Sequence, residues 1–215
     1  LRLHRTGISS MKYLQSEHTE LPVGEVKLSN EEMKALLNIA ADVPTIRTSL
    51  IGMLAAKEAL AEAGLLTSPK IPRIGFISGT TVGGMDKTEQ HYLDFPNTNQ
   101  YDAYISTHDC GACTELIADY FGGFSFVTSI STACSSAANA IILGAELIQS
   151  GEMDIVVVGG SESLTKYHLN GFNTLMILDK DQCRPFDQTR CGLNLGEGAA
   201  YLILEKASSA LKRHV

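Results

Sequence analysis

Long apolar runs are missing from this sequence of 215 residues, whereas a membrane-spanning helix needs about 20 consecutive apolar residues. The nearest approach, residues 137–148, is interrupted by Asn139, Gly144 and Glu146. A basic excess is missing as well, because 17 Lys and Arg residues face 24 Asp and Glu residues. The resulting net charge of −7 argues against a nucleic-acid partner, which would require a basic face. We therefore expect neither a membrane nor a nucleic acid as a partner.

No secretory signal is evident, and the sequence contains no internal repeat or low-complexity tract. The five cysteines are an odd number and lack the spacing of a small secreted domain, which favours a reducing, cytoplasmic compartment. Hydrophobic residues make up 44% of the chain and charged residues 19%, proportions that predict a globular protein with a sizeable core.

Four segments are rich in β-branched and apolar residues, as buried strands are. They are residues 73–79, 126–132, 154–159 and 200–205. Helical patterns separate the earlier strands, which predicts a layered α/β domain with parallel pairing and right-handed crossovers. No convincing packed helix separates the last two strands, so the sequence allows either a parallel or an antiparallel final strand.

Capping residues and glycines mark the helix boundaries. Ser29 and Glu32 form a capping box that predicts a short helix up to about residue 40. A longer helix is predicted from about residue 45 to residue 63, and Gly64 is well placed to end it. Residues 161–182 are interpreted as a long excursion between strands.

Residues 126–148 combine a predicted strand, a sharp turn and a predicted helix, and Cys134 lies at the turn. Its thiol should sit at the N-terminus of the helix, where unpaired backbone N–H groups and the helix dipole favour an anion. The thiolate is the nucleophilic form of cysteine, and the small neighbours Ala133 and Ser135 leave room for a substrate. The alternative is that Cys134 is buried and packs as a small hydrophobic residue.

Four motifs follow one another along the chain. They are Ser78-Gly79-Thr80-Thr81-Val82-Gly83-Gly84, Ser131-Thr132-Ala133-Cys134-Ser135-Ser136, Val158-Gly159-Gly160-Ser161-Glu162, and Arg184-Pro185-Phe186-Asp187 with Gly192 and Gly196-Glu197-Gly198-Ala199. Together they resemble the N-terminal half of a β-ketoacyl-acyl-carrier-protein synthase, a condensing enzyme with the thiolase-like fold, from about Gly7 to the C-terminus. The resemblance implies a layered α/β/α domain with a mixed, mostly parallel sheet, which is one incomplete half of a duplicated fold.

The resemblance implies that Cys134 is the catalytic nucleophile that accepts an acyl group, and that its backbone N–H is one donor to the thioester oxyanion. It also implies that Thr132, Ala133 and Phe186 bind substrate. Tight backbone packing is at least as good an explanation for Phe186 and for the glycines of residues 192–199. A malonyl-carrier thioester would then lose carbon dioxide and attack the Cys134 thioester, in a decarboxylative Claisen condensation of fatty acid or polyketide biosynthesis.

The resemblance implies two partners and no metal or organic cofactor. In the family, the strand before the cysteine pairs across a two-fold axis, so residues 126–132 are the implied dimer strand of a homodimer. The second implied partner is an acidic acyl carrier protein, which should dock on a local basic patch. Arg47, Lys70 and Arg73 are not obviously clustered in the sequence, so the patch has no predicted place.

Two parts of the family's enzymes have no counterpart in the sequence. The opening strand of the first sheet is absent, and so is the C-terminal half with its two catalytic histidines and, usually, a lysine. Residues 1–215 are therefore interpreted as an N-terminal β-ketoacyl synthase domain that does not complete a full turnover alone. Two alternatives stay open: a thiolase or coenzyme-A-dependent synthase of the same fold, and a non-catalytic fragment that dimerises.

The other cysteines do not predict a metal site. Cys110 and Cys113 form a single C-x-x-C pair, and a tetrahedral zinc site would need two further ligands at suitable spacing. Cys183 and Cys191, with seven residues between them, do not fit such a spacing.

Three carboxylates could act as acids or bases but are interpreted as hydrogen-bonded structural groups at strand and loop ends: Glu162, Asp187 and Glu197. The histidines match no catalytic motif of the family, and each is interpreted as a surface or loop residue. They are His4, His18, His91, His108, His168 and His214, of which His108 and His168 are the first to inspect.

Overall fold

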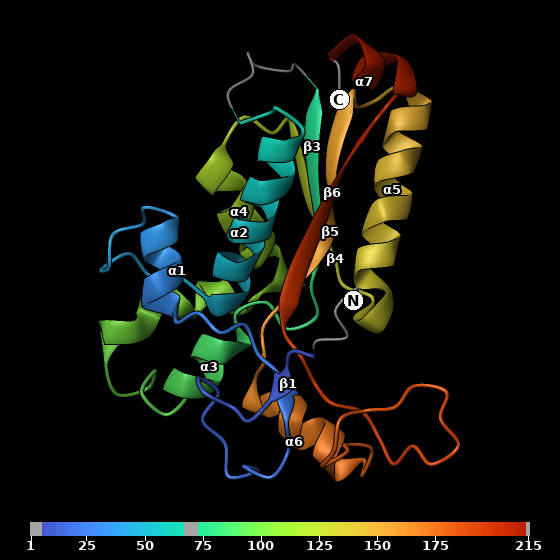
Figure 1. Cartoon of the computed structure of the whole chain (residues 1–215). Helices are drawn as coiled ribbons and strands as arrows, with labels where there is room; N and C mark the ends of the chain where they lie inside the picture. Colours follow the sequence, from blue (N-terminus) through green and yellow to red (C-terminus); the bar gives the residue numbers. More distant parts are fainter. Residues whose placement is uncertain (1–5, 67–72, 214–215) are drawn as a thin grey trace.

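A computed structural model describes residues 6–66 and 73–213, and a four-stranded sheet lies at its centre (Figure 1). The strands follow the order β4 (Phe126–Ile130), β3 (Ile74–Gly79), β5 (Ile155–Glu162) and β6 (Gly198–Glu205). β3 pairs in parallel with both β4 and β5, whereas β6 runs antiparallel to β5. The mostly parallel sheet is confirmed, and the final strand is indeed antiparallel.

Helices cover both faces of this sheet (Figure 1). α2 (Arg47–Glu62) and α4 (Cys110–Phe121) lie on one face, and α5 (Ser136–Ser150) lies on the other. Because successive strand residues point to opposite faces, Phe76 belongs to the core under α2 and α4, and Ile77 belongs to the core under α5. The chain therefore has the predicted α/β/α layers.

The predicted helix boundaries are confirmed where capping residues marked them. α1 (Asn30–Leu36) begins after a complete capping box, in which Glu32 N donates to Ser29 Oγ (3.1 Å) and Ser29 N donates to Glu32 Oε2 (2.7 Å). α2 is followed by Gly64 in the left-handed region (φ +63°), as a helix-ending glycine should be.

The other elements are short. They are β1 (Ile8–Ser9), β2 (Val23–Gly24), α3 (Met85–His91), α6 (Lys166–Thr174), α7 (Ala207–Arg213) and the 3₁₀ helices η1 (Asn99–Tyr104), η2 (Ser106–His108) and η3 (Ala133–Ser135). α6 lies in the predicted excursion and contacts α3, so it does not cover the sheet between β5 and β6. No helix in residues 6–66 and 73–213 is long and apolar enough to cross a membrane. His4, Lys70 and His214 lie outside the described residues.

Candidate active site

The predicted nucleophile lies where the carboxyl ends of β3 and β5 meet the start of α5. Cys134 is in η3, the turn directly before α5, and it is exposed. The alternative of a buried thiol that packs as a small hydrophobic residue is therefore wrong. Gly79 at the end of β3 permits this close approach, since a Cβ there would lie 2.6 Å from Ala137 N and from the Ser136 carbonyl carbon.

The turn that carries Cys134 has an unusual backbone and several bonds that hold it. Ala133 has φ +52°, a conformation that costs a residue with a Cβ about 1–2 kcal/mol. Its carbonyl oxygen accepts hydrogen bonds from Ser136 Oγ (2.7 Å) and Thr81 Oγ1 (3.5 Å). Ser136 is buried, and its Oγ also accepts from Thr132 N (2.9 Å). These contacts fix the turn and therefore the place of Cys134.

Thr132 contributes to the same network rather than to the space beside Cys134. Its Oγ1 accepts hydrogen bonds from Ser135 Oγ (3.0 Å) and from Asn139 Nδ2 (2.8 Å) in the first turns of α5. It is absent from the residues that line the adjacent hollow. A substrate contact of Thr132 stays a prediction, whereas its role in holding the turn is visible.

An open hollow of about 500 Å³ lies beside Cys134. Its lining consists mainly of small, neutral residues: Gly79, Thr80, Thr81, Ala133, Cys134, Ser136, Ala137, Gly160, Ser161, Glu162, Gly198, Ala199 and Ala200. The Glu162 carboxylate is the single charged group in this lining, and it accepts hydrogen bonds from Thr81 N (2.7 Å) and Thr80 Oγ1 (3.0 Å). Glu162 thus has the structural bonds expected of it, and the hollow offers room for an apolar group.

Phe186 does not join this hollow. It is fully exposed in the turn of residues 184–187, with φ +66°, and it is not a lining residue. The glycine-rich loop does contribute, through Gly198 and Ala199. Asp187 accepts from Thr189 Oγ1 (2.6 Å) and Thr189 N (2.7 Å), and these bonds lower the pKa of Asp187. Substrate binding by Phe186 stays a prediction.

His91 corrects one expectation, because it is buried in α3 and not on the surface or in a loop. Its ring stacks on Tyr101 at a centroid distance of 3.8 Å, and Tyr104 lies parallel at 5.6 Å. Its Nδ1 also lies 3.3 Å from Asp94 Oδ2. The two tyrosines of η1 explain the burial, which no local feature of α3 predicted.

The other described histidines have local partners. His108 Nδ1 pairs with Thr88 Oγ1 (2.9 Å), His18 Nδ1 lies 3.9 Å from Glu20 Oε1, and the His168 ring lies near Phe172. No histidine of the described ranges lines the hollow beside Cys134.

Cys110 and Cys113 lie at the start of α4. Burial raises the pKa of both thiols, most strongly for Cys113, which is fully enclosed. The Cys110 thiol donates to Thr81 O (3.5 Å). Within the part of the chain that the structure describes, no group of three or more His, Cys, Asp or Glu residues is placed to hold a metal ion.

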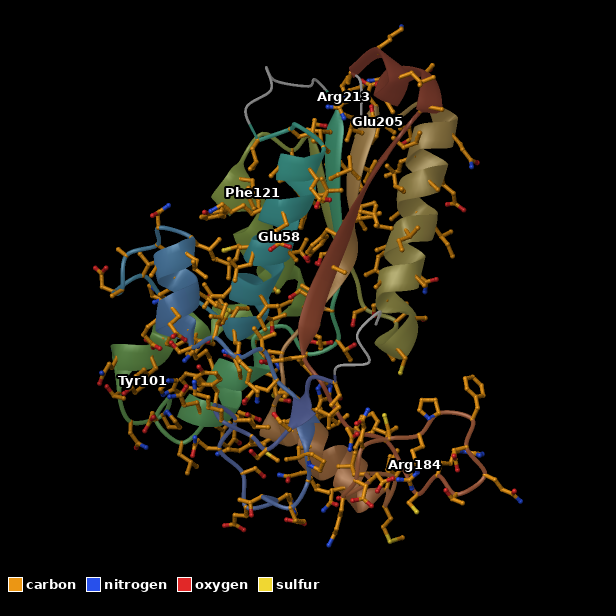
Figure 2. All side chains as sticks on the ribbon, in the orientation of Figure 1. Glu58, Tyr101, Phe121, Arg184, Glu205 and Arg213 are labelled. Atoms are coloured by element: carbon orange, nitrogen blue, oxygen red, sulfur yellow. The ribbon has the colours of Figure 1, made fainter. Side chains whose placement is uncertain are left out.

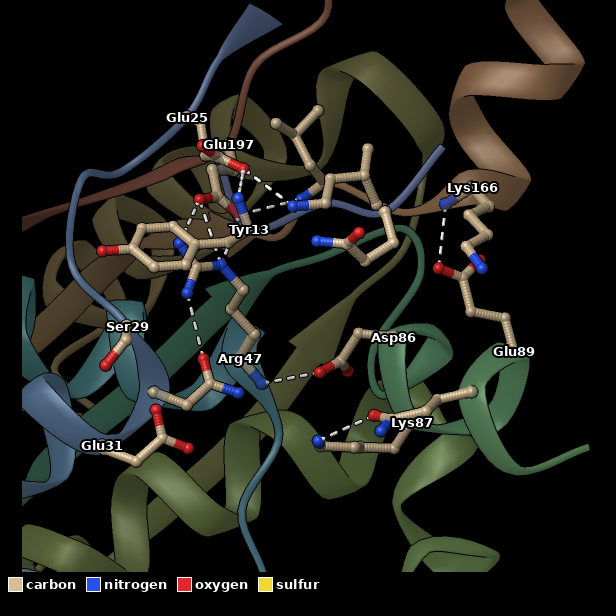
Figure 3. Close-up of a pocket in the computed structure, with 15 residues that line it drawn as sticks. Tyr13, Glu25, Ser29, Glu31, Arg47, Asp86, Lys87, Glu89, Lys166 and Glu197 are labelled. Atoms are coloured by element: carbon tan, nitrogen blue, oxygen red, sulfur yellow. Dashed lines mark hydrogen bonds and ion pairs between the residues drawn. The ribbon is translucent and has the colours of Figure 1, made fainter. Parts of the chain in front are cut away.

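A second hollow, of about 400 Å³, lies beside the start of α2 and is strongly charged (Figure 3). Arg47 and Glu197 form a buried ion pair in its wall, and Arg47 N donates to Asp86 Oδ2 (3.1 Å). Burial raises the pKa of Asp86. The docking patch had no predicted place in the sequence, and Arg47, one of the three basic residues considered for it, is buried. No local signal indicated its partner, which is 150 positions away.

Comparisons with known proteins agree with one another. Residues 45–210 match the family model described as the N-terminal domain of β-ketoacyl synthase. Nodulation protein E of Rhizobium meliloti is 32% identical, over 85% of this chain and 48% of that protein. The chloroplastic 3-oxoacyl-[acyl-carrier-protein] synthase I of Hordeum vulgare is 30% identical, over 75% of this chain and 38% of that protein. The chain therefore spans about half the length of such relatives, or less.

A solved structure gives the same result. The ishigamide ketosynthase/chain length factor superposes with a TM-score of 0.85 at 26% identity, over 98% of this chain and 54% of that one. The thiolase-like, layered fold with a mixed sheet is thereby confirmed.

Proposed function

Because this chain belongs to the family of β-ketoacyl synthase N-terminal domains, we propose that it is the nucleophile-bearing half of a condensing enzyme. Residues 1–215 would be the N-terminal β-ketoacyl synthase domain. The observation that carries the proposal is the exposed Cys134, held in a tight turn at the start of α5 beside a hollow with small walls.

In the proposed reaction, the Cys134 thiolate attacks the carbonyl carbon of an acyl-carrier thioester. The new C–S bond forms as the carrier's C–S bond breaks, and the carrier thiolate takes up the proton that the Cys134 thiol lost and leaves as a thiol. A malonyl-carrier thioester then releases carbon dioxide, and its carbanion forms a C–C bond with the acyl carbon. The Cys134–acyl bond breaks, which returns the Cys134 thiolate and yields a β-ketoacyl group on the malonyl carrier.

The chain's own residues support the first of these steps. The turn of Ala133 and Cys134 precedes α5, where backbone N–H groups can stabilise both a thiolate and a thioester oxyanion. The walls formed by Gly160, Gly198 and Ala199 leave space for an acyl chain. The decarboxylation step needs groups that the lining of this hollow does not contain, so we assign it to a C-terminal half like that of the longer relatives.

We further propose an acyl carrier protein as the donor and a homodimer formed through residues 126–132, in a cytoplasmic compartment. β4 lies at one edge of the sheet, and Val127 on it is 37% exposed, which favours pairing of this strand with a second chain. The ishigamide neighbour is a ketosynthase/chain length factor, so a related second chain is the alternative partner for β4.

The test is the intact mass of the chain after incubation with an acyl-carrier thioester, alone and together with the C-terminal half of a relative. We expect an acyl adduct that is lost in the Cys134→Ala variant. Cys191→Ala is the matched control, because Cys191 is also exposed but lies outside the hollow. The proposal would be wrong if a folded chain took no acyl group, either alone or with the C-terminal half. It would also be wrong if the adduct still formed in the Cys134→Ala variant.

The same assay separates the alternatives. Acylation by coenzyme-A thioesters and not by carrier thioesters would favour a thiolase or a coenzyme-A-dependent synthase. An adduct that forms but never yields a β-ketoacyl product with both halves present would favour a non-catalytic fragment.

A further inference from the structure

The buried ion pair of Arg47 and Glu197 is unusually well connected (Figure 3). The Arg47 side chain is 10% exposed and the Glu197 side chain is fully buried. Arg47 Nε donates to Glu197 Oε2 (2.9 Å), and Arg47 Nη2 donates to Glu197 Oε1 (2.5 Å), which is a bidentate contact. Such a pair fixes the direction of both side chains as well as their separation.

The remaining Arg47 donors reach the segment that leads into α1 and the first residue of that helix. Nη2 donates to Val26 O (2.9 Å), and Nη1 donates to Leu28 O (3.1 Å) and Asn30 Oδ1 (3.0 Å). One side chain at the start of α2 thus holds residues 26–30 in place.

Glu197 reaches two further segments. Its carboxylate accepts from Val26 N (2.9 Å) and from Leu164 N (3.1 Å), just beyond β5. Its backbone N–H donates to Gly24 O (2.8 Å). Gly198, the next residue, begins β6 and lines the hollow beside Cys134. The pair therefore holds the loop that forms one wall of that hollow.

Stability alone does not account for this arrangement. Taking two charges out of water is costly, and a well-packed apolar pair of similar volume is often equally stable or more so. What the ion pair supplies is a single geometry, because each group is held by several directional bonds. A shift of about 1 Å in a substrate-positioning wall can change a rate by about 100-fold.

We propose that Arg47 and Glu197 are positioning residues for acyl transfer to Cys134, acting through the wall formed by Gly198 and its neighbours. This inference rests on the proposed function, since it concerns the thioester that Cys134 would attack. Neither side chain lines the Cys134 hollow itself.

The experiment compares two rates for Cys134 in the same samples. The chain is used alone if it forms the acyl adduct alone, and otherwise together with the C-terminal half of a relative. One is acylation by the acyl-carrier thioester, and the other is alkylation by iodoacetamide, a small reagent that needs no wall to orient it. Cys113 reports unfolding, because it is fully buried in the native chain. The variants are Arg47→Lys and the double variant Arg47→Met/Glu197→Gln, which leaves no buried charge unpaired.

The control variant is Arg213→Met, which removes another ion pair, with Glu205. Figure 2 shows Arg213 and Glu205 at the opposite end of the molecule from Arg184. We expect the double variant to lose acylation by about 100-fold. Its Cys134 alkylation and its Cys113 protection should be unchanged. Arg47→Lys should recover part of the acylation rate, and Arg213→Met should keep all of it.

Wild-type acylation rates in both Arg47 variants would overturn this inference and leave the proposed function standing. A loss of acylation that only parallels Cys113 exposure in both variants would overturn it too, since the role would be structural. If Cys134 of the unmodified chain takes no acyl group in either form of the assay, the proposed function fails, and this inference fails with it.

Discussion

The two faces of the sheet differ in how completely they are covered. On one face, α2 and α4 enclose a core in which Phe76 and Val157 are fully buried, and Tyr201 Oη bonds Ser78 Oγ (2.6 Å). On the other face, Ile77, Val156 and Val158 are just as buried, but two other large apolar side chains are not. Ile142 of α5 is 55% exposed, and Leu202 of β6 is 53% exposed. The candidate nucleophile is thus attached to the layer that still has a free apolar side.

This difference bears on the proposal that a second half contributes to the site beside Cys134. A contiguous exposed apolar surface can mark the place where another layer packs, and Ile142 and Leu202 are the residues at which we test for such a surface. The relatives are about twice as long as the chain, so they have a further segment that could supply that layer.

The largest expected effect is on the covered face. Phe76→Ala removes a fully buried ring that lies 5.3 Å from the Tyr201 ring and 5.2 Å from the Phe124 ring. We expect the free energy of unfolding to fall by about 3–5 kcal/mol, through lost burial and a residual cavity. Denaturant unfolding measures this. A loss no larger than that of a surface substitution would show that this core is not closely packed.

An intermediate effect is expected from Arg213, whose ion pair ties α7 to β6 and whose hydrogen bond to Ala63 O ties α7 to the end of α2. Arg213 Nη2 lies 2.6 Å from Glu205 Oε1, and Arg213 Nη1 donates to Ala63 O (2.8 Å). Arg213→Met should lower the free energy of unfolding at neutral pH by about 1 kcal/mol, since the pair is partly exposed.

The pH dependence of that difference sharpens the test. The hydrogen bond from Arg213 holds the pKa of Glu205 below its ordinary value of 4.5. An acid with a lowered folded-state pKa stabilises the fold above its unfolded pKa and loses that effect as the pH falls. The two proteins should therefore differ at neutral pH and converge below pH 4.5. A constant difference across this range would contradict the assignment.

The smallest effect is expected on the outer side of α5. Ile142→Ser should change the free energy of unfolding of the chain by no more than about 0.5 kcal/mol, because the side chain is mostly exposed. It should nevertheless weaken association with the C-terminal half of a relative, measured by titration calorimetry. Unchanged association would show that the C-terminal half does not pack on this side of α5. The difference between the two faces of the sheet would then say nothing about where that half binds.

Local chemistry made much of the fold predictable from the sequence. The capping bonds of α1 join Ser29 and Glu32, which are close in the sequence. Gly64 can follow the end of α2 because glycine readily adopts a positive φ. The strands were recognisable because β3 and β5 are buried along their whole length or nearly so. The place of Cys134 also followed from a local change of pattern.

Features that depend on distant partners were not predictable. Nothing near Arg47 indicates a bond to Glu197, and nothing in α3 indicates the stacking of His91 on Tyr101. The left-handed backbone of Ala133 was equally hidden, because alanine does not favour that conformation. One of the bonds that hold it comes from Thr81 Oγ1, which is distant in the sequence.

The edge position of β4 has a consequence for handling the protein. The segment Phe126-Val127-Thr128-Ser129-Ile130 contains no charge and no proline, the two features that usually prevent edge strands from joining indiscriminately. A short, neutral segment with high β-propensity is also typical of aggregating sequences. A chain whose β4 edge is unpaired should therefore self-associate and lose solubility as its concentration rises, and production together with a chain that pairs with this edge should keep it in solution.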